Sequence, residues 1–341
     1  MTDAAVLGPL AVFAAAALVI AVLGVRLSNR ADRVADRTGL GEAVVGAVIL
    51  GGMTSLPGIV ATTRLALGDH AALAVSSAVG GIAVQTAFLA VADLAYRRAN
   101  LEHAAASLPN LLFGALLLVL LSLLMLAMST PDLALGHVHP LSLAIPLAYV
   151  GGLRWVQQSR EEPMWHPRIT RQTREDVPED SARREPLRPL LVDLLLTGLG
   201  VALAGWTIGR VAPALSAATG LTDSLIGGTL VAISTSLPEL VTTVAAVRQG
   251  ALTLAVGGIL GGNAFDTLFV AIADLAYWPG PITADVSPQE PQLIAISALM
   301  TSVLLLGLMR RQRSGPGNVG VETVIVLGLY LLAVLLLGRG G

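Results

Sequence analysis

The stretch Thr54-Ser55-Leu56-Pro57-Gly58 returns later in the chain as Thr235-Ser236-Leu237-Pro238-Glu239, after a shift of 181 positions. The same shift aligns the two halves over roughly 56 positions without a gap, and about 21 of these positions are identical. Both copies place a proline and two hydroxyl side chains in the middle of an apolar stretch. Unpaired backbone groups are tolerated there only against protein or a cavity. We therefore expect both copies to face an internal cavity.

The composition is that of a membrane protein. Of the 341 residues, 54% are hydrophobic and 13% are charged, and the mean hydropathy is +0.75. These values are too apolar for an ordinary soluble domain. The formal net charge of −2 argues against a nucleic-acid partner, and the absence of cysteine excludes disulfides and thiolate metal ligands. An acidic Asp3 and no basic segment precede the first apolar run, so we expect a retained span and not a cleaved signal peptide.

Ten stretches are apolar enough to cross a membrane as helices, which takes about 20 residues each. They fall near 5–25, 40–67, 71–96, 107–128, 139–158, 188–211, 223–248, 251–277, 290–309 and 319–338. The polar segment between the fifth and sixth is rich in Arg, Glu, Asp and Pro, which is typical of a flexible connector. The sequence therefore predicts an all-α membrane protein with a first five-helix repeat in 1–158, a cytoplasmic linker in 159–187 and a second five-helix repeat in 188–341.

The arginines predict how the chain is oriented. Alternate loops hold 18 of the 21 basic residues, and the remaining loops and the C-terminal end hold only Arg64, Arg210 and Arg339. The positive-inside rule places the arginine-rich loops in the cytoplasm and both termini outside. With five spans in each half, the second half then enters the membrane from the opposite side. The duplication is therefore predicted to be an inverted repeat, which is typical of secondary transporters.

Glu239 is the strongest candidate for a functional residue. It falls in the middle of the seventh predicted span, directly after Pro238 and close to the hydroxyls of Thr235 and Ser236. A carboxylate at the bilayer centre costs about 2.5–3.5 kcal/mol on insertion scales, so it needs a reason to be there. Carboxylate, hydroxyl and freed carbonyl oxygens together favour a hard cation. The alternative is a proline kink beside a buried, protonated glutamate.

Asp266 is the second candidate. It ends the segment Gly261-Gly262-Asn263-Ala264-Phe265-Asp266 in the eighth span, where paired glycines permit close backbone approach and Asn263 adds an amide oxygen. The alternative is a helix cap or an interhelical hydrogen bond. The repeat mates Asp93 and Asp274 fall near span ends, where we expect interfacial anchoring. None of the five histidines forms a metal-binding pair on a helix, so a membrane zinc protease finds no support. The spans contain no nucleophile–base pair that would favour another intramembrane enzyme.

These motifs resemble the α-repeats of the calcium/cation antiporter superfamily, which includes sodium/calcium and proton/calcium exchangers. The superfamily carries a Thr-Ser-x-Pro-Glu motif in each half, followed by a Gly-Ser-Asn-type segment. The resemblance implies an exchanger fold of about ten helices, no cofactor, and transported cations that are Ca²⁺ and Na⁺ or H⁺. It also implies a set of cation ligands: Glu239, Asp266, Thr235, Ser236, Thr54, Ser55, Gln85 and Asn263.

The first half departs from the superfamily pattern. Gly58 stands where the first-half glutamate is expected, Ile82 replaces an asparagine, and Gly81 and Gly262 replace serines. With Glu239 and Asp266 ionised, the site carries about two negative charges, which one Ca²⁺ or two monovalent ions would balance. The hypothesis that follows is an antiporter in the cell membrane with a stoichiometry below three Na⁺ per Ca²⁺. The competing hypothesis, which Gly58 favours, is a degenerate protein that keeps the fold without transport and acts as a partner or regulator.

Overall fold

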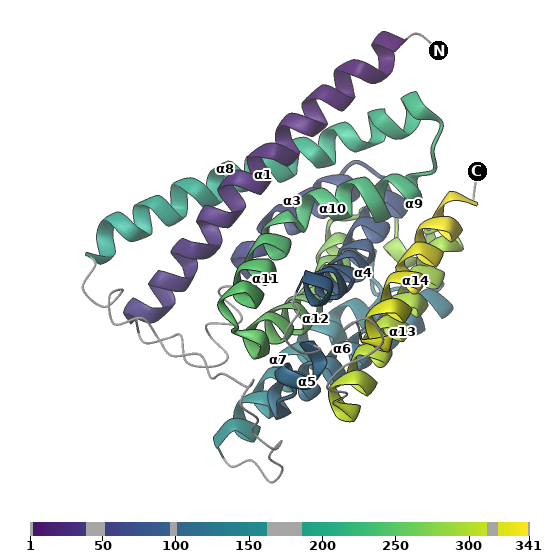
Figure 1. Ribbon diagram of the computed structural model, residues 1–341. Coiled ribbons are helices and arrows are strands. Elements are labelled where there is room, and N and C mark those ends of the chain that lie inside the picture. The colour runs from purple at the N-terminus through teal and green to yellow at the C-terminus, as the bar shows by residue number, and fades with distance from the viewer. Residues whose placement is uncertain (1–2, 39–51, 96–100, 162–185, 312–319, 340–341) are drawn as a thin grey trace.

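The computed structural model describes residues 3–38, 52–95, 101–161, 186–311 and 320–339 (Figure 1). Within these ranges the regular structure is helical, apart from one isolated bridge between Leu135 and Val138. The first half contains α1 (Asp3–Thr38), α3 (Leu56–Ala66), α4 (Ala71–Ala95), α5 (Leu101–Ala105), α6 (Leu108–Ser129) and α7 (Pro140–Glu161). Residues 40–51 of the second predicted span and most of the predicted linker lie outside the described residues.

The second half repeats this order. It contains α8 (Leu187–Thr219), α9 (Asp223–Leu225), the π-helix η3 (Ile226–Val231), α10 (Ala232–Thr235), α11 (Leu237–Gln249), α12 (Leu252–Ala276), the 3₁₀ turn η4 (Ile282–Ala284), α13 (Gln289–Arg310) and α14 (Val321–Gly338). α4 and α12 both have 25 residues, and α6 and α13 both have 22. Each pair keeps the shift of 181, so the repeat extends beyond the region where the sequence is visibly duplicated.

Seven helices of the described residues are long and apolar enough to cross a membrane, and the bent pair α9–α10 plus α11 makes eight. α7 has 22 residues but is less apolar, since its last turns carry Arg154 and two glutamines. Together with α3 and the helical residues 52–54 before it, these helices are consistent with the ten predicted spans. Two helices extend beyond the predicted spans. α1 continues to Thr38 and α8 continues to Thr219.

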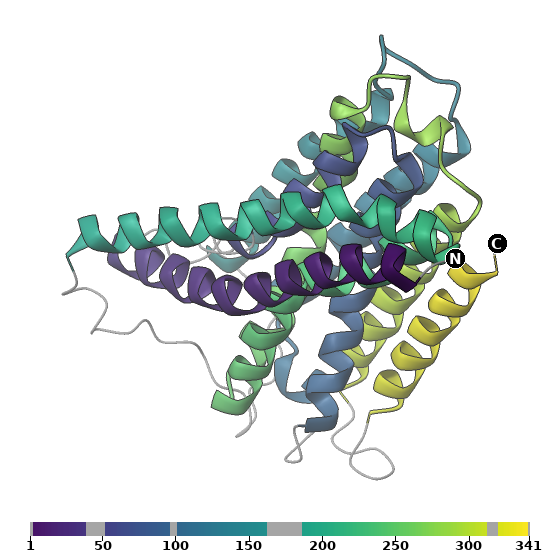
Figure 2. The ribbon, with the colours of Figure 1, turned by 90° about the horizontal axis from the view of Figure 1, so that it is seen from above.

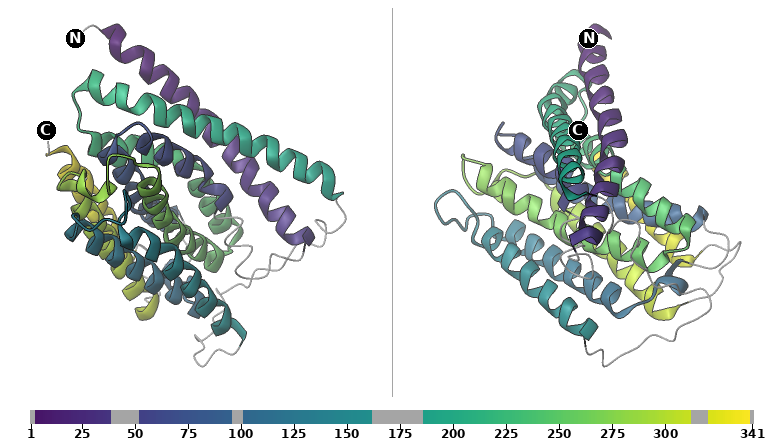
Figure 3. Two further views of the ribbon diagram at one scale, coloured as in Figure 1. Left: turned by 180° about the vertical axis from the view of Figure 1, so that it is seen from behind. Right: turned by 90° about the vertical axis from the view of Figure 1, so that its left-hand side faces the viewer.

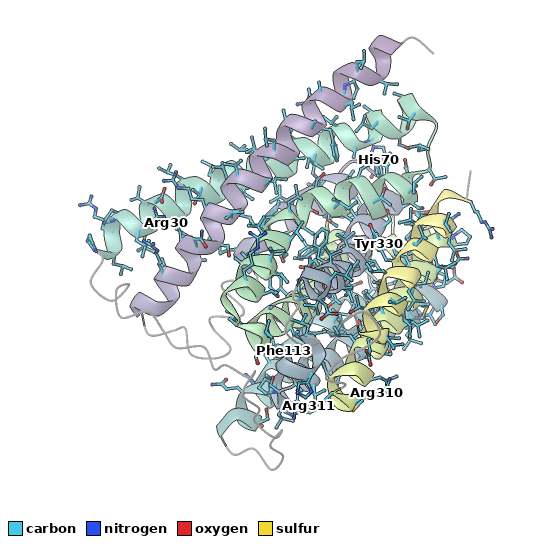
Figure 4. All side chains as sticks on the ribbon, in the orientation of Figure 1. Arg30, His70, Phe113, Arg310, Arg311 and Tyr330 are labelled. Atoms are coloured by element: carbon cyan, nitrogen blue, oxygen red, sulfur yellow. The ribbon has the colours of Figure 1, made fainter. Side chains whose placement is uncertain are left out.

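α1 and α8 pack along each other and cross the other helices at an angle (Figures 2 and 3). Arg26 and Arg30, one turn apart on α1, both pair with Asp193 of α8, at 2.8 Å and 2.6 Å. These contacts explain why α1 stays helical beyond its apolar stretch. Figure 4 shows Arg30 at one end of this α1–α8 pair. In the remaining bundle, Arg310 and Arg311 lie at one end and His70 lies at the other.

Each long helix packs against the break of the other half. A Cβ atom on Gly205 of α8 would lie 2.5 Å from the carbonyl oxygen of Pro57, and one on Gly24 of α1 would overlap the ring of Pro238. Gly24 and Gly205 are equivalent in the repeat, as are Pro57 and Pro238. Because both glycines lack a side chain, α1 can pack closely against the break at Pro238 and α8 against the break at Pro57.

Asp93 and Asp274 are not interfacial anchors, because both are fully buried. Asp93 Oδ1 accepts a hydrogen bond from the backbone N–H of Leu101 at 2.7 Å, and Asp274 Oδ1 accepts one from Ile282 at 2.6 Å. In each case the donor lies eight residues further along the chain. Asp93 therefore links α4 to the first residue of α5, and Asp274 links α12 to the first residue of η4, since backbone donors buried away from water need a partner.

Candidate functional site

Both copies of the quoted motif interrupt a helix in the middle of the molecule. Residues 52–54 are helical, the chain turns at Ser55, and α3 starts at Leu56. In the second half the turn falls at Ser236, and the helices on either side of it are bent by 50°. Pro57 and Pro238 stand in the first turn of α3 and α11, where a missing N–H costs nothing. The prolines thus end one helix and start the next, with hydroxyl side chains at the break.

A small internal cavity lies between these breaks and the central helices α4 and α12. It has room for about one water molecule or bare cation. The residues that line it come from both halves: Ser55, Gly58, Ser77, Ala78, Gly81, Gln85, Thr235, Ser236, Glu239, Asp266 and Phe269. Six of the eight predicted ligands are therefore gathered around one space, and they come from α4, α10, α11, α12 and the two breaks.

Two carboxylates face this space and share one hydroxyl. The exposed fraction is 7% for Glu239 and 2% for Asp266. Ser55 Oγ lies 2.7 Å from Asp266 Oδ1 and 3.5 Å from Glu239 Oε1. Within the described part of the chain neither carboxylate pairs with an arginine. Two buried carboxylates without a counter-charge are costly, so the arrangement favours a positive ion between them.

Several buried oxygens at the site accept no hydrogen bond. Gln85 Nε2 donates to Asp266 Oδ2 at 2.6 Å, while Gln85 Oε1 receives no hydrogen bond from any described residue. Glu239 Oε2 is buried and unsatisfied in the same way, and so is Asn263 Oδ1 on α12, outside the cavity lining. Amide and carboxylate oxygens can only accept, so a water or a cation is the partner they lack. Oxygen atoms of these types are the ligands that Ca²⁺ and Na⁺ prefer.

The other two predicted ligands stand beside the cavity. Thr54 is buried and its hydroxyl bonds to Glu239, so it supports a carboxylate of the cavity wall. Asn263 lies on α12 nearly one turn before Asp266, and its Nδ2 donates to Thr86 Oγ1 on α4 at 2.9 Å. Asn263 therefore joins the two central helices. The described residues contain no group of three or more His, Cys, Asp or Glu side chains that could hold a metal ion, so a cation at this site depends on hydroxyl and amide oxygens as well as the two carboxylates.

Sequence reasoning missed Ser77 and Phe269. Ser77 Oγ donates to the carbonyl oxygen of Ala74 at 2.9 Å and lies 3.0 Å from Thr62 Oγ1. Its spacing of four residues from Gly81 and eight from Gln85 puts all three on one face of α4, and this was a usable signal. Phe269 carries no such signal, because nothing in the sequence says which ring faces Gly58.

Broken helices from two related halves, meeting around buried carboxylates, define the class as a multi-pass membrane transporter fold. The sequence profile of the sodium/calcium exchanger protein family matches residues 8–151 and 190–338. The chain belongs to this family.

Relatives and solved structures agree with this assignment. The chain is 38% identical over 89 residues to the sodium/calcium exchanger MaX1 of Methanosarcina acetivorans, and 38% identical over 94 residues to the putative antiporter CaxA of Alkalimonas amylolytica. The alignments cover 26% and 27% of this chain, and 25% and 30% of those relatives.

Among solved structures, an H⁺/Ca²⁺ exchanger CAX matches with a TM-score of 0.68 at 11% identity, over 96% of this chain and 85% of that one. The sodium-calcium exchanger NCX_Mj matches with a TM-score of 0.61 at 19% identity, over 97% and 98%. At these identities the structural matches establish the fold.

Proposed function

We propose that this protein is a secondary active antiporter that exchanges Ca²⁺, or a related cation, for Na⁺ or H⁺ by alternating access. One observation carries the proposal: Glu239 and Asp266 are buried in one cavity where Gln85 Oε1 and Glu239 Oε2 accept no hydrogen bond. The names of the relatives MaX1 and CaxA and of the structural matches CAX and NCX_Mj support the same chemistry.

In this proposal Glu239 and Asp266 supply the charge that holds the cation. Ser55, Thr235, Ser236 and Gln85 supply neutral oxygens, and Thr54 and Asn263 hold the neighbouring groups in place. The site lacks a first-half carboxylate at Gly58, so about two negative charges face the bound ions. One Ca²⁺ or two monovalent cations would balance them, whereas three Na⁺ would leave an excess charge. The exchange therefore moves fewer than three Na⁺, or H⁺ in their place, per Ca²⁺.

Alternating access requires a mobile part and a fixed part. The α1–α8 pair is the natural mobile part, because it packs on both broken helices and its own helices are joined by Arg26, Arg30 and Asp193. We place the protein in the cell membrane with both termini outside, on the strength of the arginine distribution. The halves 1–158 and 188–341 would each contribute one broken helix, connected by the cytoplasmic linker 159–187.

The test is uptake of ⁴⁵Ca²⁺ into proteoliposomes under an imposed Na⁺ or pH gradient. Uptake that follows one gradient and disappears in Glu239→Gln establishes antiport and identifies the coupling ion. Glu322→Gln is the matched control, because Glu322 is also a buried glutamate in a spanning helix but lies at the Arg310 end of α14, away from the cavity. Folded wild-type protein that neither binds nor transports cations would overturn the proposal in favour of a non-transporting partner or regulator.

A further inference from the structure

We propose that Phe269 determines the ion specificity of this site by occupying the place of a first-half carboxylate. Its ring confines the bound cation to the carboxylates of the second half and excludes a further monovalent cation from the first-half side. The part of this inference that concerns ion specificity rests on the proposed function. Its structural part, the exclusion of a side chain at residue 58, stands independently of transport.

The repeat itself shows what is missing. Glu239 and Gly58 occupy equivalent positions, directly after Pro238 and Pro57. A Cβ atom on Gly58 would lie 2.7 Å from Cε2 of Phe269 and 3.5 Å from its Cζ. Carbon atoms that are not bonded make favourable contact only from about 3.5 Å outward. A side chain of any size at residue 58 therefore requires the ring of Phe269 to move.

The ring is held in place by other aromatic side chains. Phe269 is 4% exposed and packs edge-to-face on Phe265, with 6.1 Å between ring centroids. Phe265 packs in the same way on Tyr149 of α7 at 5.8 Å, and its ring tip lies 3.4 Å from a Cβ position on Gly52. Two rings one turn apart on α12 thus fill the space beside two glycines of the first broken helix. Displacing one ring disturbs the whole row.

The second half does not share this arrangement. Phe88 of α4 is the residue equivalent to Phe269, and it is not among the residues that line the cavity. The cavity lining therefore has an aromatic ring at Gly58, and both of its carboxylates come from the second half. Ser55, Ser77 and Gln85 are the polar side chains that the first half contributes to the lining, and all three are neutral. A cation in the cavity therefore has charged ligands from the second half only.

The experiment is a double-mutant cycle with a matched control. Gly58→Glu is made in the wild type, in Phe269→Ala and in Phe265→Ala, and thermal unfolding of each purified protein is followed in detergent. Phe265 is the control because it has the same size and lies in the same row but does not line the cavity. We expect Gly58→Glu to lower the unfolding midpoint of the wild type, with the loss reduced to about half or less in Phe269→Ala. The loss should be reduced by a smaller amount in Phe265→Ala, because Phe265 only supports the ring that residue 58 displaces.

The second measurement is the number of Na⁺ ions moved per Ca²⁺, from parallel ²²Na⁺ and ⁴⁵Ca²⁺ fluxes in proteoliposomes. The double variant Gly58→Glu/Phe269→Ala is expected to move about one more monovalent cation per Ca²⁺ than the single variant Phe269→Ala. The reason is that a third buried carboxylate is balanced by one more positive charge. An unchanged ratio overturns the assignment of specificity to Phe269. Equal losses of unfolding midpoint in all three backgrounds overturn the steric part. If the wild-type protein binds no cation, the proposed function is wrong. The thermal double-mutant cycle still shows whether the ring of Phe269 excludes a side chain at residue 58.

Discussion

Gln85 and Asp266 occupy equivalent positions in the two halves, 181 residues apart, and they hydrogen bond to each other with Nε2 2.6 Å from Oδ2. The pseudo-twofold axis of the repeat therefore passes close to this contact, at the wall of the cavity. Two aspartates at these positions would place like charges against each other. An amide on one side avoids the repulsion and still offers an oxygen to the cavity.

Gln85→Leu is predicted to lower the affinity for Ca²⁺ by about tenfold or more. The substitution removes the free Oε1 and leaves Asp266 Oδ2 without its donor, and hydrogen bonds to charged groups contribute about 1.5–3 kcal/mol. Isothermal titration of detergent-solubilised protein with Ca²⁺ measures the change. Gln158→Leu, on an exposed position of α7, is the control and should leave the affinity unchanged. An equal loss in both variants would contradict the role of Gln85.

Ser55 and Ser236 are equivalent in the repeat, but they are predicted to contribute unequally to cation binding. Ser55 Oγ lies 2.7 Å from Asp266, whereas Ser236 Oγ has only a long contact of 3.4 Å with Gln85 Nε2. We expect Ser55→Ala to weaken Ca²⁺ binding several-fold more than Ser236→Ala, by about 1 kcal/mol. Each variant is the other's control, and competition of Ca²⁺ against bound ⁴⁵Ca²⁺ measures both. Equal effects would mean that the cavity is functionally symmetric.

Asp274→Ala is predicted to destabilise the protein more than Asp93→Ala. Asp274 accepts two backbone N–H groups, from Ile282 at 2.6 Å and from His139 at 2.7 Å. Asp93 accepts one backbone N–H and the hydroxyl of Thr323. Leaving two buried backbone donors unpaired costs about 2–5 kcal/mol. Thermal unfolding in detergent should show the larger loss for Asp274→Ala, and an interfacial role for these residues would instead predict small losses in both.

Gly205→Ala is predicted to impair transport, because the added methyl group would lie 2.5 Å from the backbone of Pro57 and push α8 off the break. Overpacking of this kind costs about 1–3 kcal/mol. Gly328→Ala is the control, since a Cβ atom on Gly328 of α14 meets nothing within 4 Å. That change should be neutral or stabilise the helix by about 0.5–1 kcal/mol. Ion-flux and thermal-unfolding measurements on both variants test the prediction, and wild-type flux in Gly205→Ala would contradict it.

Tyr277 gives the protein an alkaline dependence of stability. Burial raises the pKa of Tyr277 to about 12, and the hydrogen bond from its hydroxyl to Asp285 adds to the shift. An unfolded tyrosine ionises near pH 10. The stability that Tyr277 contributes is therefore complete below about pH 10 and is lost as the pH rises toward 12. Unfolding midpoints from pH 9 to 12 should fall less steeply in Tyr277→Phe, and parallel curves for the two proteins would contradict the assignment.

Much of the site was predictable because it follows from local chemistry. Pro57 and Pro238 remove a backbone donor, so an apolar helix has to break beside each of them, whatever surrounds it. Glu239 and Asp266 are carboxylates inside apolar stretches, where the cost of burial restricts them to the protein interior. A duplicated motif then implies that both breaks occupy equivalent places. Together with the resemblance to the antiporter superfamily, these inferences predicted the six ligands that line the cavity.

The other outcomes depended on contacts between distant parts of the chain. Asp93 and Asp274 fall near helix ends, which suggested the membrane interface, but their partners eight residues further on fold back and bury them. Thr54 and Asn263 have the right chemistry for ligands and lie close to the cavity, yet their side chains face Glu239 and Thr86. The direction of a side chain at a helix crossing is set by the neighbouring helix.

The sequence by itself determined the apolar spans, the duplication, the two proline breaks and the presence of two carboxylates at the centre. Each of these follows from the identity and spacing of residues along the chain. Only the tertiary structure decided that α1 and α8 pack through Gly24 and Gly205 against the breaks of the opposite halves. It also decided that the ring of Phe269 fills the space at Gly58. The physical reason is that close packing is a property of surfaces from different helices, and the sequence specifies those surfaces without stating which of them meet.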